Sequence, residues 1–249
     1  MSLDSCLAEA FSHYIELQSC ERAHLARFEE TEKHYPKQVD IHTEGESAAS
    51  LHVVKKGWLY SYTDFADGRR QIVKVHVPGD VVGFADLAYP TATTTLRTCA
   101  DATVCPFPKE ALDEVMQRAP RLSALLLTIA LRDQVILVDT LKAMGRMSAR
   151  ERVAYFLLDL QARLRVLNGP DLTGYALPLS QTEIGDIIGL TNVYVSKTLG
   201  RLEEAGRIKR ENGRIEIVEE DDLRAMVGFV DRYATLDTDW FQTSAIARD

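Results

Sequence analysis

Side chains suited to nucleic-acid contacts gather in one short stretch of the chain, TNVYVSKTLGRL, which begins at Thr191. The outward side chains at helical spacing are Asn192, Val193, Ser196, Lys197 and Arg201. Short polar groups can hydrogen-bond base edges, a valine methyl can pack on a thymine methyl, and cations can pair with phosphates. This chemistry needs a helix that presents all five residues on one exposed face.

The residues before this stretch predict how such a helix is held. Ser180 and Glu183 form a capping box, which starts a helix about two turns long. Gly189 suits the left-handed residue that ends it, and Thr191 suits the N-cap of the next helix. Two helices joined by a glycine-containing turn predict a helix-turn-helix, with Ser180 and Thr191 near the expected DNA. The alternative is a helical hairpin that has no role in DNA binding.

A basic β-hairpin is predicted directly after the second helix. Asn212-Gly213 separates the alternating runs RIKR and RIEIV, and Asn-Gly favours a tight hairpin turn. Arg210 and its basic neighbours on this wing could contact the DNA backbone. Residues 192–214 hold six cations and three acids, a net of +3, although the whole chain carries −8. A local basic face on an acidic protein fits selective DNA binding.

Short β-rich runs with Gly/Asp turns dominate the chain from Tyr35 to about residue 107. They predict an antiparallel sandwich or barrel, with a hairpin at Asp67-Gly68. One of them, VHVPGDVVGF, places the turn Pro78-Gly79-Asp80 and then Gly83 between apolar runs. Glycines in such a turn can bring backbone N–H groups close to an anion.

A long helix is predicted from Pro120 to about Gly145, and it has two apolar faces. One face follows alternating steps of four and three residues, typical of a coiled-coil seam: Leu127, Leu131, Gln134, Val138 and Leu141. The other face comprises Leu122, Leu125, Ile129 and Ile136. Two apolar faces indicate two partners, the chain's own barrel and another chain, although a single buried core helix is the alternative. Ser148 and Glu151 form a further capping box, which marks a domain boundary.

Length and composition favour a cytoplasmic protein of two domains. The chain has 249 residues, 46% of them hydrophobic. No apolar run approaches the roughly 20 residues that cross a bilayer, and the first residues do not resemble a secretory signal. The four cysteines contain no CxxC pair, and free thiols are expected. No catalytic triad order, metal-ligand spacing or phosphate loop stands out, so no enzyme is expected.

The order of these parts resembles the CRP/FNR family of bacterial transcription regulators. The residues that carry the resemblance are GDVVGF in the β-rich part, the long helix, and EIGDIIGLTNVYVSKTLGRL. The resemblance covers about residues 20 to 218 and implies an α+β fold: an antiparallel, jelly-roll-like β-roll sensor, a dimerisation helix and a winged helix-turn-helix. We expect these domains at residues 1–119, 120–145 and 146–218, followed by an acidic, partly helical extension at 219–249.

The resemblance also implies an effector pocket in the roll, formed by Gly79, Gly83, Phe84, Arg97 and Leu137. In the cyclic-AMP-binding members, a glutamate follows the second glycine, and an Arg-Ser pair some ten residues later holds the phosphate. Phe84 stands in the glutamate position here, and the later stretch is TATTTLRTC, with Arg97 displaced along it. A buried phosphate without a cation is unfavourable, so we expect the roll to be retained and cyclic-AMP binding to be lost.

The family's other cofactors find little support. Its iron–sulfur members use closely spaced N-terminal cysteines, whereas Cys6, Cys20, Cys99 and Cys105 are scattered. Haem-binding members use a histidine, yet isolated histidines are more often solvated or core residues. We therefore expect no cofactor and no metal.

The expected protein is a homodimeric, sequence-specific transcription regulator. Its expected partners are double-stranded DNA, a second copy through Leu127, Leu131, Val138 and Leu141, RNA polymerase if it activates, and an unidentified small molecule. No membrane partner is expected. The alternative function is a small-molecule sensor that signals through protein–protein contacts.

Overall fold

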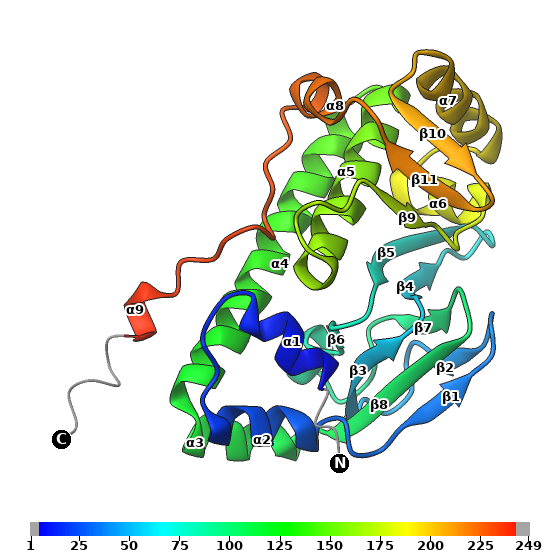
Figure 1. The fold of residues 1–249 in the computed structure, drawn as a ribbon. Coiled ribbons are helices and arrows are strands. Elements are labelled where there is room, and N and C mark those ends of the chain that lie inside the picture. Colours follow the sequence, from blue (N-terminus) through cyan, green and yellow to red (C-terminus); the bar gives the residue numbers. More distant parts are fainter. Residues whose placement is uncertain (1–4, 243–249) are drawn as a thin grey trace. The chain divides into compact units, whose positions relative to one another are not determined.

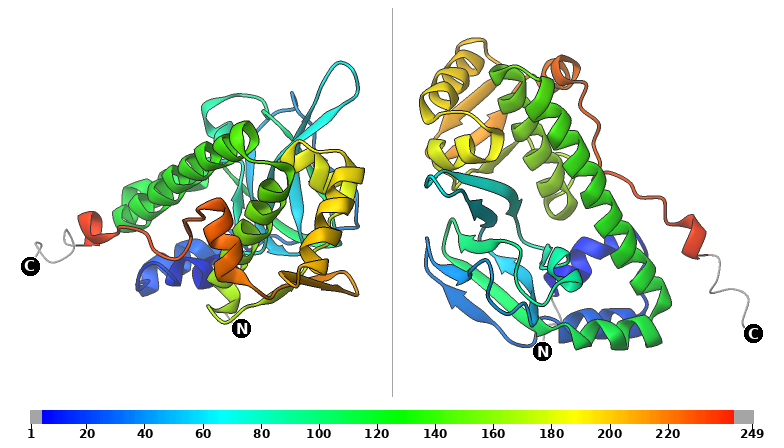
Figure 2. Two further views of the ribbon diagram at one scale, coloured as in Figure 1. Left: turned by 90° about the horizontal axis from the view of Figure 1, so that it is seen from above. Right: turned by 180° about the vertical axis from the view of Figure 1, so that it is seen from behind.

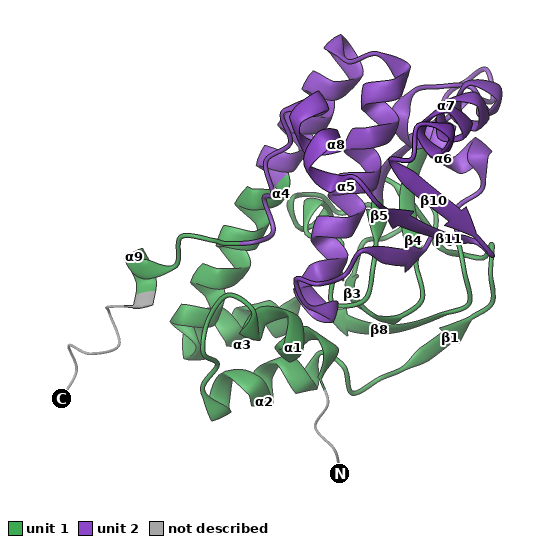
Figure 3. Cartoon of the chain, turned by 45° about the horizontal axis from the view of Figure 1, so that its top comes forward, with its two compact units in different colours: residues 1–63, 75–133, 235–249 green, residues 64–74, 134–234 purple. Residues whose placement is uncertain are grey.

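The computed structural model describes residues 5–242 and divides the chain into two compact units (Figure 3). Of the described residues, the first unit comprises 5–63, 75–133 and 235–242. The second comprises residues 64–74 and 134–234. The long helix α4, Pro120–Arg146, contributes to both units (Figure 1).

Two four-stranded antiparallel sheets form the expected roll. One has the strand order β1-β8-β3-β6 and the other β2-β7-β4-β5. The strands are β1 Lys33–Tyr35, β2 Asp40–His42, β3 Ser50–Lys56, β4 Leu59–Asp64, β5 Arg70–His76, β6 Val81–Val82, β7 Thr95–Thr98 and β8 Ala102–Pro108. Strands that are neighbours in a sheet, such as β1 and β8, are far apart in the sequence. The sequence of one strand therefore does not reveal which strand pairs with it.

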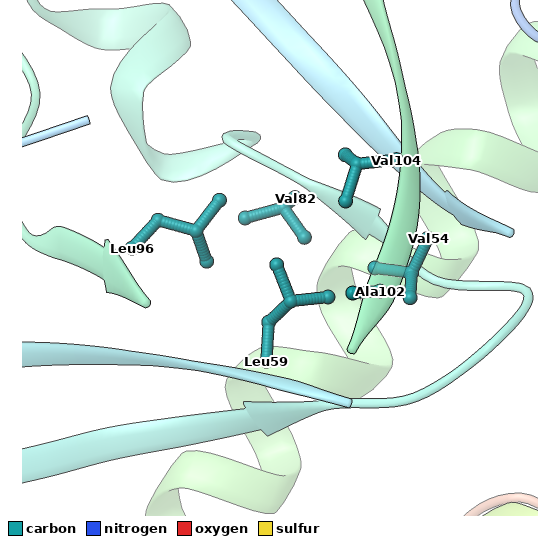
Figure 4. Packing of buried hydrophobic residues seen from close by; sticks show 6 residues of the cluster. All are labelled: Val54, Leu59, Val82, Leu96, Ala102 and Val104. Atoms are coloured by element: carbon teal, nitrogen blue, oxygen red, sulfur yellow. The ribbon is translucent and has the colours of Figure 1, made fainter. Parts of the chain in front are cut away.

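Inward-facing apolar side chains of five strands fill the roll (Figure 4). Alternation along each strand sends every second residue to this core. The cluster consists of Val54, Leu59, Val82, Leu96, Ala102 and Val104. Tyr35 and Ile41 pack against it from the edges.

The Pro78-Gly79-Asp80 turn is held by hydrogen bonds within the roll. The Gly79 N–H donates to the Val54 carbonyl at 2.9 Å, and the Val54 N–H donates to the Asp80 carbonyl at 2.9 Å. The Asp80 carboxylate accepts from the Val77 N–H at 2.7 Å. The turn therefore ties β6 to β3, and the Gly79 N–H already has an acceptor.

Helices α1 (Cys6–Ser12), α2 (Ser19–Arg27) and α3 (Glu110–Arg118) belong to the first unit, as does the short 3₁₀ helix η1 (Ala85–Ala88). The sequence predicts a helix from Cys20 to Lys33, with Leu25 and Phe28 on one face, and this prediction is wrong at the helix end. Helix α2 stops at Arg27, because Lys33 begins strand β1 and pairs with Val104 of β8. Phe28, just beyond α2, stacks on Phe107 with ring centroids 4.2 Å apart.

Helix α4 has the two faces that its sequence predicts. Leu122 and Leu125 are completely buried, and Ile129 is 9% exposed. The seam residues instead face solvent in the single chain: Leu127, Leu131, Val138 and Leu141 are 54, 51, 48 and 70% exposed. Leucines exposed in a row on one helix indicate an interaction surface.

The second unit contains α5 (Ala149–Asn168), α6 (Gln181–Ile188), α7 (Asn192–Glu204) and α8 (Glu220–Val227). Its sheet has the order β10-β11-β9, built from β9 (Gly174–Ala176), β10 (Ile208–Glu211) and β11 (Arg214–Ile217). The hairpin at Asn212-Gly213 is confirmed by the β10–β11 pairing, and β9 adds an unexpected third strand (Figure 2). The last helix is α9 (Asp239–Gln242).

Two of the four thiols, Cys6 and Cys105, have raised pKa values. Cys99 and Cys105 are buried, and burial raises the pKa of Cys105 to about 11. Burial, with the nearby Glu29 carboxylate, raises the pKa of Cys6 to about 12.

Among the described residues, no group of three or more His, Cys, Asp or Glu side chains could hold a metal ion. Nor, within that part, is any helix sufficiently long and apolar to cross a membrane.

His52 is a buried histidine of strand β3 in the roll. Its side chain is 9% exposed, and burial, with repulsion from His42, lowers its pKa to about 4. The His42 ring lies 5.7 Å away between centroids. The folded state binds this proton less readily than the unfolded chain, whose histidines titrate near about 6.5. The contribution of this histidine to the free energy of unfolding is therefore fully present above about pH 6.5. It is lost progressively as the pH falls toward the pKa of the folded state.

Acidification should consequently unfold the protein more readily, and His52→Leu should reduce this effect. We expect the free energy of unfolding to fall by about 2 kcal/mol between pH 7 and 5 through this histidine. Urea titrations at the two pH values measure it. His13→Leu, at an exposed histidine, should retain the wild-type acid sensitivity. A His52→Leu protein with an unchanged pH dependence would contradict the assignment.

Candidate nucleic-acid interface

The two helices of the predicted helix-turn-helix begin at the predicted caps. The Glu183 N–H donates to the Ser180 hydroxyl at 3.2 Å, and the Glu183 carboxylate accepts from the Ser180 N–H at 2.7 Å. The Thr191 hydroxyl accepts from the Tyr194 N–H at 3.4 Å and starts α7. Both capping predictions are confirmed, so these hydroxyl oxygens hold the helix ends.

Two glycines make the turn between α6 and α7 tight. Gly189 adopts the left-handed conformation, at φ +67°, that ends α6. At Gly185, a Cβ atom would lie 2.3 Å from the Leu190 carbonyl oxygen, so a side chain has no room there. The Leu190 N–H in turn donates to the Gly185 carbonyl at 3.0 Å. The sequence shows Gly185, but nothing in its pattern reveals this close approach.

Three side chains from elsewhere in the second unit secure the end of α6. The Arg70 guanidinium donates twice to one Asp186 carboxylate oxygen, at 3.0 and 2.8 Å. The Gln71 amide donates to the Asp186 and Ile187 carbonyls at 2.7 and 3.2 Å. Arg152 of α5 donates to the Ile188 carbonyl at 3.3 Å. Carbonyls that a helix end leaves without partners are thus satisfied, which fixes the helix that positions α7.

Helix α7 buries one face and exposes the other. The buried residues are Val195, Thr198, Leu199 and Leu202. The exposed ones are Asn192, Val193, Tyr194, Ser196, Lys197, Arg201 and Glu204, and all but Tyr194 and Glu204 are in the set that the sequence predicts. Val193 and Tyr194 are 59 and 60% exposed. Within the described residues, neither Lys197 nor Arg201 forms an ion pair, so both cations are available to an anionic partner.

The wing carries cations with different degrees of internal pairing. Arg210 donates to the Glu203 carboxylate of α7 through Nε at 3.0 Å and a terminal nitrogen at 2.6 Å. This ion pair attaches the wing to α7 and partly neutralises the charge of Arg210. Lys209 is 63% exposed at its side chain and lies 3.8 Å from Glu211. Arg214 donates to the Gly174 carbonyl at 3.1 Å and remains exposed.

Arg97, the candidate cation of the effector pocket, lies on the outer face of β7. The next residue, Leu96, is in the roll core, and successive residues of a strand point to opposite faces. The Arg97 guanidinium makes two hydrogen bonds of 2.6 Å to the Asp40 carboxylate. It also lies over the Tyr62 ring, 5.4 Å from its centroid.

Two threonines of the stretch TATTTLRTC are engaged in hydrogen bonds within the roll. The Thr93 hydroxyl and N–H donate to the Asp86 carboxylate at 2.7 and 2.8 Å, and Asp86 is 6% exposed. The Thr95 hydroxyl accepts from the Glu44 N–H at 3.0 Å. The Asp86 carboxylate, buried in the roll, is therefore the partner of Thr93.

The remaining pocket candidates are more dispersed. Gly83 and Phe84 follow β6 and are partly exposed. Leu137 belongs to the second unit and is 60% exposed on α4. Gly79, as described above, donates its N–H within the turn.

A β-roll, a long helix with a solvent-facing apolar seam, and a winged helix-turn-helix with available cations define a DNA-binding transcription regulator with an attached sensor domain. Comparison with known proteins gives the same class. Residues 32–119 match the family model for the cyclic nucleotide-binding domain, and residues 151–226 match that for the Crp-like helix-turn-helix domain. The chain belongs to the CRP/FNR family of transcription regulators and is not an enzyme.

Individual relatives agree with this assignment. The nitrogen fixation regulation protein FixK of Bradyrhizobium diazoefficiens is 32% identical, over 84% of this chain and 87% of its own. The transcriptional activator protein Anr of Pseudomonas aeruginosa is 29% identical, over 74% of this chain and 75% of its own. The solved structure of FixK2 from Bradyrhizobium japonicum matches with a TM-score of 0.72 and 29% identity, covering 80% of this chain and 98% of that one.

Proposed function

We propose that the protein binds a two-fold symmetric operator as a homodimer in the cytoplasm, with one α7 helix in each half-site. The observation that carries the proposal is the exposed face of α7. Thr191 caps the start of α7, and Arg70, Gln71 and Arg152 fix the end of the preceding helix α6. On α7 itself, Lys197 and Arg201 are unpaired within the described residues. In this family fold, α7 is the helix that enters the major groove.

The seam of α4 is the proposed dimer contact. Leu127, Leu131, Val138 and Leu141 would pack on the same residues of the second copy, which buries side chains that are otherwise half exposed or more. On this proposal the functional domains are those expected from sequence: residues 1–119 as the sensor, 120–145 as the dimerisation helix and 146–218 as the DNA-binding domain. RNA polymerase is the further partner that activation would require.

Base reading is assigned to the first two turns of α7. Val193 cannot accept a hydrogen bond, and its methyl groups suit a thymine methyl. Lys197 can donate to guanine O6 or N7, without the fork of an arginine. Asn192 and Ser196 add short polar contacts, and Ser180, Thr191, Arg201 and Arg210 lie where phosphates would pass. Arg210 would do so while paired with Glu203, as a bridge between wing and helix.

Cyclic AMP is not the proposed effector. Arg97, the candidate cation for a phosphate, is already paired with Asp40 on the outer face of β7. In addition, Asp86 places a buried carboxylate beside Thr93. Like charges and an unpaired buried phosphate both oppose binding. The roll is proposed to be empty or to take an apolar or weakly polar ligand near Phe84.

Calorimetric titration with cyclic AMP should therefore show no binding tighter than ~1 mM, about −4 kcal/mol. The same DNA-binding curve should be obtained with and without the nucleotide. A micromolar dissociation constant would show that the roll finds another cation for the phosphate and would contradict this account.

The DNA-binding function itself is tested by a salt-dependent gel shift on the DNA upstream of the protein's own gene. Lys197, Arg201 and wing cations that reach phosphates make the affinity fall linearly with salt on logarithmic axes. Saturable binding with this dependence supports the proposal. An absence of binding at low salt would favour the alternative, in which the winged domain docks on another protein.

A further inference from the structure

The segment that follows the DNA-binding module lies beyond the residues that match the Crp-like helix-turn-helix model, which end at residue 226. Residues 228–234, here called the C-terminal strap, leave α8 and belong entirely to the second unit (Figure 1). Helix α8 itself is fixed to α5, because Arg165 makes two hydrogen bonds to Glu220 at 2.8 and 2.7 Å. The strap therefore starts from a fixed point.

An aromatic contact holds the beginning of the strap on α5. The Phe229 ring meets the Tyr155 ring edge to face, with centroids 5.6 Å apart. The Arg224 guanidinium lies over the same Phe229 ring, 5.0 Å from its centroid. The Phe229 N–H donates to the Arg224 carbonyl at 3.0 Å, which completes the end of α8.

An ion pair holds the end of the strap on α4. The Arg232 Nε donates to the Asp139 carboxylate at 2.9 Å, with the two side chains 35 and 14% exposed. Lys142 donates to the other oxygen of the same carboxylate at 2.9 Å. Asp139 follows Val138 of the apolar seam, so the strap meets α4 beside the proposed dimer contact.

The strap also closes on itself around the second anchor, Arg232. The Asp231 carboxylate accepts from the Tyr233 and Ala234 N–H groups at 2.9 and 3.0 Å and lies 3.7 Å from Arg224. Tyr233 is 4% exposed. A turn closed by its own side chain and a buried ring can transmit position from one anchor to the other.

The two anchors lie on opposite sides of a break in the helices. Helix α4 ends at Arg146 and α5 begins at Ala149, so only two residues join them. In a dimer formed through α4, the angle between α4 and α5 sets the separation of the two α7 helices. We propose that the strap braces this angle and thereby fixes the half-site spacing that the dimer accepts, with Arg232 as the positioning residue. This inference rests on the proposed dimeric DNA binding.

Operators of altered spacing test the brace in the full-length protein. The two-fold site enriched from random DNA is compared with versions whose spacer is one base pair longer or shorter. One base pair turns a half-site by about 34° and moves it by about 3.4 Å, so wild type should prefer its own spacing at least ~10-fold. Arg232→Ala and Phe229→Ala should each lower that preference by roughly threefold or more, because they free one anchor.

Folding and charge are controlled by the choice of variants. Arg232→Ala leaves Asp139 paired with Lys142, so the Asp139 carboxylate keeps a cationic partner. Arg232→Lys should restore part of the preference. Arg118→Ala, at a 71% exposed arginine that pairs with Glu114 on α3, should leave it unchanged.

The outcomes separate this inference from the function beneath it. Folded strap variants that keep the wild-type spacing preference would overturn the brace, as would an equal loss in Arg118→Ala. A wild-type protein that binds no operator of any spacing would overturn the proposed function instead.

Discussion

Leu127→Glu and Val138→Glu are each expected to turn the protein into a monomer. Both side chains are about half exposed in the single chain, 54 and 48%, on the seam of α4. Burying the exposed half of a leucine or valine contributes about 0.8–1.5 kcal/mol, and each change occurs twice in a symmetric dimer. Loss of about 1.5–3 kcal/mol would raise the dimer dissociation constant roughly 10- to 10²-fold, before repulsion between the paired glutamates is counted.

Sedimentation velocity measures this directly. Met116→Glu, at a 62% exposed methionine of α3, is the matched control and should sediment as wild type. The monomeric variants should also lose most of their affinity for a two-fold site, since one half-site contact remains. Both seam variants sedimenting as wild-type dimers would show that the seam is assigned to the wrong face.

Lys197→Ala is expected to weaken operator binding by about 1–3 kcal/mol and to relax the preference at one base position. The lysine is exposed on α7 and has no ion-pair partner among the described residues, so its loss costs nothing within the fold. Val193→Glu should in contrast shift the preference at its position toward cytosine, because a carboxylate accepts from cytosine N4. Affinities for single-base variants of the operator measure both effects.

Arg210→Ala provides the comparison for phosphate contacts. This substitution should lower the affinity for all DNA sequences by the same factor and reduce the salt dependence of binding. Because Arg210 is already paired with Glu203, the loss of affinity should be smaller than that of Lys197→Ala. A Lys197→Ala protein with unchanged affinity and preference would remove α7 from the groove.

Local signals predicted the reading helix well. Ser180, Glu183, Gly189 and Thr191 act through neighbours three or four residues away, and the structure shows each in its predicted role. The Asn212-Gly213 hairpin is equally local. Residues whose effect depends only on nearby backbone can be interpreted from spacing alone.

Long-range partners were not predictable in the same way. Arg70 meets Asp186 across 116 positions, and Arg232 meets Asp139 across 93. Neither pair has a spacing signal, since any exposed arginine can pair with any carboxylate that the fold brings near. The same limit applies to Arg97, whose strand face depends on the register with β2 and β4.

The most direct test of the central claim is selection of binding sites from random double-stranded DNA by the full-length protein. The account predicts enrichment of a two-fold repeat whose half-sites lie about one helical turn apart, differing from the usual family site at the base pair that Val193 reads. Enrichment of the unmodified family site would contradict the reading assigned to Val193. No enriched sequence at any salt concentration would contradict DNA recognition by α7 altogether.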